Sequence, residues 1–165
     1  MSWSVRLLSL SCGAMLVACS SSPTPEFTAD TAVDHSVFLR STTVTKDAFE
    51  AEIVGRNLEA FSGIAFRLQY DAHVLAFGSL SPGADWTDKR YVLAKEGKPG
   101  LLLVGIAEPG RPPTAPLEGE RVLATVKFKR TSEDGSEISF DTVRSELRDT
   151  NGKTVRATFT GGKLQ

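Results

Sequence analysis

The chain has 165 residues and a formal net charge of −1 at pH 7, and its charged residues form no basic or acidic block. This balance argues against a nucleic-acid-binding protein, which needs a basic surface. Both cysteines, Cys12 and Cys19, lie near the start of the chain, so the rest of it has no thiol for a disulfide, a metal or a nucleophile.

The first 18 residues have the layout of a secretory signal peptide. Arg6 is followed by an apolar stretch from Leu7 to Val17, which is too short to cross a bilayer core of ~30 Å. The sequence Leu16-Val17-Ala18-Cys19 resembles the bacterial lipobox. The resemblance implies cleavage after Ala18 and lipidation of Cys19. The alternative is an ordinary signal peptide in which Cys19 is incidental.

Residues 19–34 are predicted to be a flexible tether. The segment is rich in serine, proline and other small polar residues and has no sustained hydrophobic period. Ser20, rather than aspartate, follows the lipobox cysteine, which fits an outer-membrane lipoprotein in an organism with two membranes. We therefore expect a cell-envelope protein whose folded domain, residues 35–165, is held by a lipid anchor.

From His35 onward, short segments alternate apolar and polar residues, as β-strands with one buried face do. Clear examples are 49–53, 64–70 and 122–129, whereas Leu101 to Val104 is apolar on both faces and is predicted to be covered on both sides. Clusters of glycine, proline and asparagine separate these segments. No window has a helical stripe. The pattern predicts an all-β antiparallel sandwich.

Two turns are predicted from local chemistry. The Asp71 carboxylate can accept hydrogen bonds from amides two or three residues further on, in a single turn before Val74. Asn151-Gly152 accepts the positive φ that a tight two-residue hairpin loop requires. A calcium loop starting at Asp149 is rejected, because no carboxylate side chain follows it.

Four segments together resemble cohesin domains: Ser62 to Leu75, Ser79 to Gly83, Gly119 to Lys129 and Leu147 to Gly152. The first, with Tyr70-Asp71-Ala72-His73-Val74-Leu75, is the most specific. The resemblance implies a nine-stranded jelly-roll sandwich related to carbohydrate-binding modules. It also implies a protein partner, since cohesins of cellulosomes bind the dockerin modules of secreted enzymes.

One departure from the cohesin pattern concerns the partner. Many cellulosomal cohesins carry an asparagine and an aspartate, two residues apart, that contact the dockerin, and the matching positions here are Gly63 and Ala65. Glycine and alanine cannot supply those hydrogen bonds, so we expect no standard calcium-dockerin contact at this place. The sheet face remains free to bind something else.

The sequence gives little support for catalysis. His35 and His73 are the only histidines, and neither has the spacing of a metal site or a catalytic pair. Glu50 and Glu52 resemble paired carboxylates but are better explained as the solvated side of a strand. We predict no enzyme, no cofactor and no metal site.

Four residues are candidate binding residues. Trp86 and Tyr91 offer aromatic surfaces on which sugars or peptide side chains stack, although Trp86 is better explained as a plug over the end of the sandwich. Arg67 and Gln69 lie opposite the buried Phe66 and Leu68 and face outward. The predicted function is a non-catalytic, envelope-anchored module that docks a protein partner. The alternative is a carbohydrate-binding module.

Overall fold

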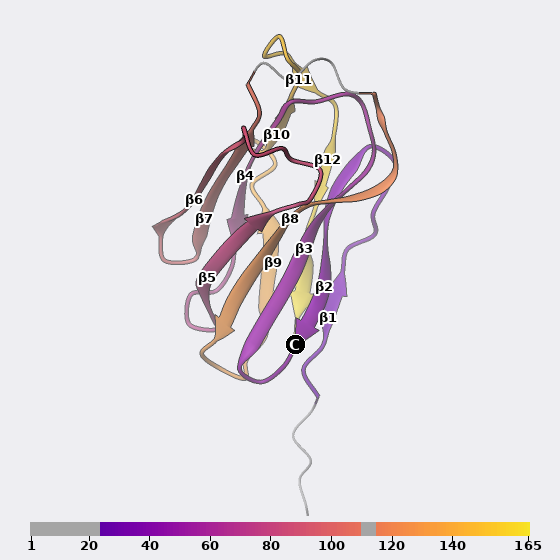
Figure 1. The fold of residues 1–165 in the computed structure, drawn as a ribbon. Helices are drawn as coiled ribbons and strands as arrows, with labels where there is room; N and C mark the ends of the chain where they lie inside the picture. The colour runs from indigo at the N-terminus through magenta and orange to yellow at the C-terminus, as the bar shows by residue number, and fades with distance from the viewer. Residues whose placement is uncertain (1–23, 110–114) are drawn as a thin grey trace, which may run out of the picture.

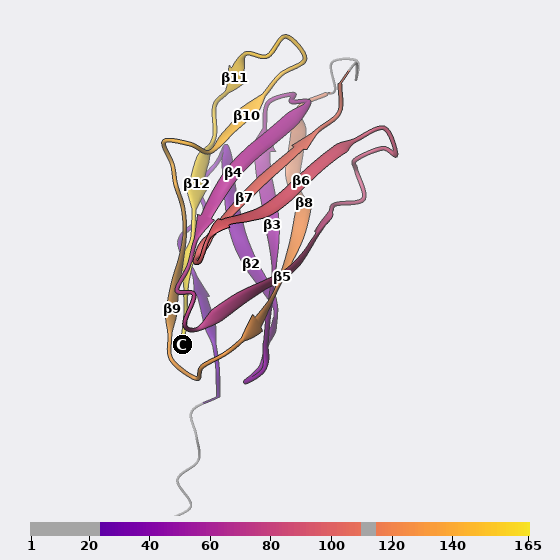
Figure 2. The same ribbon diagram turned by 90° about the vertical axis from the view of Figure 1, so that its left-hand side faces the viewer.

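A computed structural model describes residues 24–109 and 115–165, which form strands arranged in two sheets packed face to face (Figures 1 and 2). The five-stranded sheet has the order β12, β2, β3, β8, β5. Its strands are β12 (Thr158–Thr160), β2 (Ser36–Val44), β3 (Ala48–Leu58), β8 (Leu117–Arg130) and β5 (Leu75–Pro82). All its pairs are antiparallel except β12 with β2.

The second sheet is built around β4 (Gly63–Gln69). On one side β4 pairs with β7, which pairs with β6, the edge strand. On the other side it pairs with β9 at one end and with β10 at the other. The remaining members extend these edges: β1 pairs with β13, β13 with β9, and β10 with β11. Their bounds are β1 (Phe27–Ala29), β6 (Tyr91–Lys98), β7 (Leu101–Ala107), β9 (Ser136–Phe140), β10 (Glu146–Arg148), β11 (Thr154–Val155) and β13 (Gly162–Leu164).

The core lies between the two sheets and is filled by alternate residues of each long strand. In β4, for example, Ile64, Phe66 and Leu68 are buried, while the residues between them are more exposed. Aromatic rings fill the space between the layers: the Phe128 centroid lies 6.1 Å from that of Phe49 in the same sheet and 4.9 Å from that of Tyr70, which follows β4 of the other sheet. The alternation predicted from the sequence is thus the one that builds this core.

The all-β sandwich prediction is confirmed, with differences in detail. The described residues form thirteen strands rather than nine, because short strands such as β1, β10 and β11 are added at the sheet edges. Residues 1–23 and 110–114 are outside the described part, so the signal peptide and Cys19 are not placed. Within the described part, no helix is long and apolar enough to cross a membrane.

The predicted tether is too long. Phe27 to Ala29 form β1, which pairs with β13, and Phe27 packs in the core 5.1 Å from the Phe49 ring. The following residues are also fixed: the Ala32 carbonyl accepts a hydrogen bond from Arg56 and the Val33 carbonyl accepts one from Ser36. The burial of Phe27 and the backbone pairing with β13 hold this segment at a sheet edge.

The structure contains the turn predicted at Asp71, whereas the predicted two-residue hairpin loop at Asn151-Gly152 is wrong in length. The Asp71 carboxylate accepts the His73 amide at 2.8 Å, and the Asp71 carbonyl accepts the Val74 and Leu75 amides. The hairpin between β10 and β11 has a five-residue loop, not a two-residue one: Arg148 pairs with Thr154, and Asp149 bonds the Asn151 and Lys153 amides. Gly152 has the positive φ of 78°, whereas Asn151 has none.

Candidate binding face

The outward side of the second sheet carries a shallow trough. Its floor is formed by small residues of two neighbouring strands: Gly63 and Ala65 of β4 pair with Ala107 and Gly105 of β7. Because neighbouring strands lie ~4.8 Å apart, these four residues make a continuous patch without large side chains. We call this patch and its walls the trough.

Two walls rise beside the floor. On one side β6 presents Tyr91 and Leu93, with 71% and 58% of their surfaces exposed, and these residues pair with Ala107 and Gly105. On the other side β10 presents Glu146 and Arg148, which form an ion pair at 2.8 Å. Figure 2 shows β6, β7 and β4 side by side, with the β10–β11 hairpin beyond them.

The trough becomes more basic toward the β6–β7 turn. There the next two rows of side chains are Lys95, Leu103 and Arg67, then Lys98, Leu101 and Gln69. Arg67, Lys98 and Arg144 line a depression whose lining includes one carboxylate, that of Asp141. We call Arg67, Lys95, Lys98 and Arg144 the basic end of the trough.

The position of Arg67 follows from a break in the neighbouring strand. β9 and β10 flank the same side of β4 and are separated by a loop over 141–145. The Arg67 amide donates to Ser145 Oγ, and its carbonyl accepts the Asp141 amide at 2.9 Å. This loop brings Arg144 beside Arg67 in the depression and exposes 90% of Val143.

A buried tyrosine supports the wall at its basic end. Tyr70 packs in the core and donates a hydrogen bond from its hydroxyl to the Glu96 carboxylate of β6, at 2.6 Å. Burial, together with the Glu96 carboxylate, raises the pKa of Tyr70 well above its usual value. Glu96 therefore fastens β6 to the body of the sandwich.

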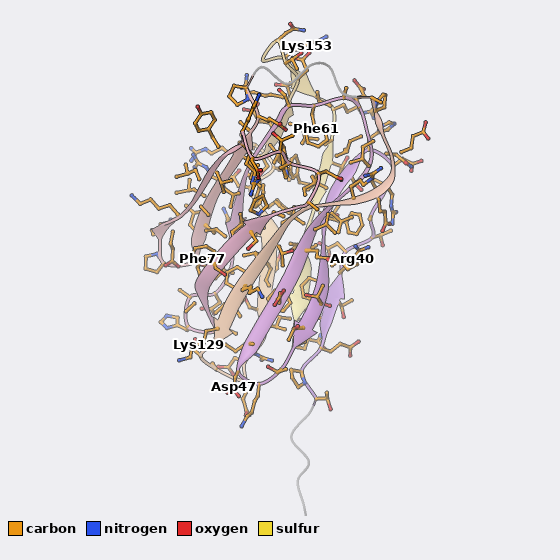
Figure 3. The ribbon with its side chains drawn as sticks, viewed as in Figure 1. Arg40, Asp47, Phe61, Phe77, Lys129 and Lys153 are labelled. Carbon is orange, nitrogen blue, oxygen red and sulfur yellow. The ribbon has the colours of Figure 1, made fainter. Side chains whose placement is uncertain are left out.

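The outward side of the five-stranded sheet has a different surface. Arg40 contacts Glu52 at 2.8 Å and Glu120 at 2.9 Å, while Arg56 contacts Glu120 at 2.6 Å. The hydrogen bond from Arg56, with the nearby charge of Arg40, holds the pKa of the Glu120 carboxyl below its usual range. Figure 3 shows Arg40 on this side of the molecule. We call this surface the ion-pair face.

Three of the four candidate residues lie on or beside the trough. Tyr91 forms part of its wall, and Arg67 and Gln69 lie in the rows at its basic end. Trp86 lies elsewhere. It is only 6% exposed, donates to the Leu123 carbonyl at 2.8 Å and packs edge-on against Phe61. The indole packs in the hydrophobic core, and its small exposed part contributes to the lining of a pocket with Asp85 and Arg121.

The paired glutamates also serve structure. Glu52 binds Arg40, and Glu50 binds Lys127 of β8 at 3.1 Å, so each carboxylate has a basic partner across the sheet. In the described residues no group of three or more histidine, cysteine, aspartate or glutamate side chains could hold a metal ion. Asp149 uses its carboxylate within the hairpin turn.

Sequence reasoning missed several trough residues, among them Leu93, Lys95, Leu103 and Gly105. Leu103 belongs to the run that was predicted to be covered on both sides, but only Leu102 and Val104 are buried. The outward Leu101 and Leu103 are partly exposed. The sequence did contain a signal for an open apolar surface: the run from Leu101 to Val104 is apolar on both faces and is followed directly by Gly105.

Comparisons with solved structures agree on the architecture. A type II cohesin domain from the cellulosome of Acetivibrio cellulolyticus matches with a TM-score of 0.58 and 23% identity, covering 86% of this chain and 95% of that one. A non-cellulosomal cohesin from Archaeoglobus fulgidus matches with a TM-score of 0.55 and 19% identity, covering 85% and 89%. No model of a known protein family and no curated protein matches the sequence.

A third match is a cohesin seen with its partner. The type II cohesin–X-dockerin complex from Acetivibrio cellulolyticus matches with a TM-score of 0.63 and 12% identity, covering 76% of this chain and 95% of that one. Cohesin domains are non-catalytic binding modules. Over most of its length, this chain has the fold of a cohesin domain.

Proposed function

We propose that this protein is a non-catalytic binding module that docks a dockerin-like protein partner in the trough. The observation that carries the proposal is the trough itself: a floor of glycine and alanine beside the exposed Tyr91 and Leu93. Exposed apolar side chains around a flat floor are the usual composition of a protein interface core.

The solved cohesins support a protein partner. Besides the complex above, a cohesin of Clostridium acetobutylicum and the OlpC cohesin of Clostridium thermocellum were each crystallised with a dockerin. In this chain Gly63 and Ala65 stand where many cellulosomal cohesins have a polar pair, and both lie on the trough floor. The contact in this protein would therefore be largely apolar at its centre.

Glycan binding has less support. Carbohydrate modules of this architecture stack sugar rings on exposed aromatic side chains. In the described residues Tyr91 is the one exposed aromatic among the large apolar side chains, and Trp86 is buried. A single tyrosine offers one stacking position rather than a row.

The test uses the chain from Ser20 onward, which contains the complete sandwich. The protein is screened against a panel of dockerin modules and against a glycan array, with Ala65→Arg as the variant that blocks the floor. Lys129→Glu is the matched control, because Lys129 lies on the other sheet (Figure 3). We expect dockerin binding that Ala65→Arg removes and Lys129→Glu preserves. Binding of a glycan and of no dockerin would contradict the proposal.

We further propose that Cys19 carries a lipid that holds the module at the cell envelope, at the outer membrane where the organism has one. The support is the lipobox-like sequence and the small, polar residues that follow it. Cys19→Ser should move the protein from the membrane to the soluble fraction and abolish incorporation of labelled palmitate. Unchanged membrane association of the variant would contradict the anchor.

A further inference from the structure

The five-stranded sheet is open beside the first part of β8. On one side β8 pairs with β3 over nearly its whole length, but on the other side β5 pairs with it only as far as Ala124, opposite Pro82. The chain then turns away from the sheet, and the Gly83 amide donates to the Leu123 carbonyl at 2.9 Å. In the part of the chain that the structure describes, no strand continues β5 alongside residues 117–122.

A pocket of about 540 Å³ lies in this gap, and its volume is typical of small-molecule sites. Its inner wall is apolar. Trp86 and Leu123 are buried, and Phe61 lies edge-on to the indole with the ring centroids 5.9 Å apart. Pro116 and Leu117 also line the pocket. Figure 3 shows Phe61 toward the end of the sandwich where the β10–β11 hairpin lies, and none of the described lining residues belongs to the trough.

The mouth of the pocket carries charges of both signs. Arg121 of β8 and Asp85 of the loop after β5 form an ion pair at 3.2 Å, and both side chains are about half exposed. Only Nη1 of Arg121 binds Asp85, so Nε and Nη2 have no hydrogen-bond partner among the described residues. Glu118 lines the same pocket, is exposed and forms no ion pair within residues 24–109 and 115–165.

These charged groups match the two charges of a free amino acid. A carboxylate binds two neighbouring guanidinium N–H groups side by side, and Nε and Nη2 of Arg121 offer such a pair. Asp85 holds the guanidinium from its other side without occupying these donors. The carboxylate of Glu118 suits an ammonium group, and the apolar wall behind suits an aliphatic side chain.

We propose that this pocket binds a free α-amino acid with an apolar side chain, such as leucine. Its carboxylate binds Arg121, its ammonium group lies beside Glu118, and its side chain packs against Trp86. An amino acid inside a peptide has lost both charges to amide bonds, so the site selects the free molecule. The pocket lies outside the trough, and the assignment goes beyond the proposed function because it does not depend on whether a dockerin binds.

The test uses the chain from Ser20 onward, in which Trp86 is the only tryptophan because Trp3 precedes it. The indole N–H of Trp86 therefore gives a single signal in proton–nitrogen correlation spectra, and this signal reports on the pocket. The probes are L-leucine and three relatives. Isopentylamine lacks the carboxylate of leucine, isocaproate lacks its ammonium group, and glycine lacks its apolar side chain. Titration of the indole signal and of the backbone amides of 115–123 gives each dissociation constant.

We expect leucine to bind about tenfold more tightly than isopentylamine or isocaproate, because each of these loses one charged partner at the mouth. Glycine should bind more weakly than leucine, since it leaves the apolar wall uncovered. Arg121→Gln should weaken leucine and isocaproate but not isopentylamine. Glu118→Gln should weaken leucine and isopentylamine but not isocaproate. Glu133→Gln is the matched control, because it makes the same change just beyond the other end of β8, and it should alter nothing.

Three outcomes would overturn the proposal. Equal binding of leucine, isopentylamine and isocaproate would show that the mouth does not recognise an amino acid. Leucine binding that Arg121→Gln and Glu118→Gln both leave unchanged would show the same. An indole signal that no probe moves would remove the site. Arg121→Gln also breaks the ion pair with Asp85, whereas Glu118→Gln breaks no ion pair among the described residues and keeps the test valid if the first variant misfolds.

Discussion

On the ion-pair face, Arg40, Arg56 and Lys127 bind Glu52, Glu120 and Glu50 across the strands. On the trough face, the cations of the basic end have no ion pair among the described residues, and leucines and glycines stand open beside them. Both surfaces belong to alternating strands of one sandwich. The difference shows that alternation fixes which side chains face outward, while the pairing of those side chains with one another differs between the two faces.

The largest expected effect comes from two neighbouring leucines on β7, which test whether the outward side of this strand is an open surface. Leu102 is fully buried in the core, whereas Leu103 faces the trough and is partly exposed. Leu102→Ala should lower the free energy of unfolding by roughly 2–5 kcal/mol, because it leaves a cavity. Leu103→Ala should cost about 1 kcal/mol or less. Urea unfolding of both variants measures the difference.

Equal losses for the two leucines would mean that Leu103 is covered by the protein itself. The trough would then be part of the core and would offer no open surface. The pair is well matched because strand, side-chain type and substitution are the same.

The second test concerns the Tyr70–Glu96 contact behind the trough wall. The pKa of Tyr70 is raised in the folded protein, whereas an unfolded tyrosine ionises near pH ~10. Above that pH the unfolded state holds fewer protons than the folded one, so stability falls as pH rises, by up to about 1.4 kcal/mol per pH unit. Below that pH this contribution is fully present.

Tyr70→Phe should remove this alkaline slope, because phenylalanine has no proton to lose. Unfolding free energies of the two proteins between pH 8 and pH 11 give the comparison, in which lysine titration is common to both. A variant that keeps the full slope would show that Tyr70 is not its source.

The smallest expected effect lies on the ion-pair face. Glu120→Gln keeps the shape of the side chain but removes its contacts with Arg40 and Arg56. These groups are partly exposed, so the loss should be about 0.5–1 kcal/mol, and it should shrink in 1 M salt. The lowered pKa of Glu120 means that its contribution is present above about pH 4.3 and is lost as pH falls. Thermal unfolding at two salt concentrations measures it.

The same variant should leave dockerin binding in the trough unchanged. If Glu120→Gln weakened dockerin binding, the two faces would not be independent, and the contrast drawn between them would be wrong.

Much of the fold followed from local patterns in the sequence. The alternation in 64–70 placed Phe66 in the core and Arg67 outside, and the Asp71 turn followed from its carboxylate. These predictions succeeded because a side-chain period of two and a cap depend on neighbouring residues alone.

The errors arose where the answer depends on distant residues. Phe27 joined the sandwich because β13, at the other end of the chain, offered it a free edge. Leu103 stayed partly exposed because only the neighbouring β6, through Gly97, lies against it on the outward side, which its own apolar run could not reveal. The pairing of Glu120 with Arg40 likewise joins residues 80 positions apart.

The position of β1 near the start of the chain also affects which part of the trough would face away from a membrane. Phe27 pairs with Leu164, and in Figure 1 β1 lies toward the end of the molecule opposite the β10–β11 hairpin. With Cys19 lipidated as proposed, only a handful of residues would separate the acyl chains from this first strand. The β10–β11 hairpin would then lie at the end of the sandwich away from the anchor, and an arriving partner would meet the apolar part of the trough before its basic end.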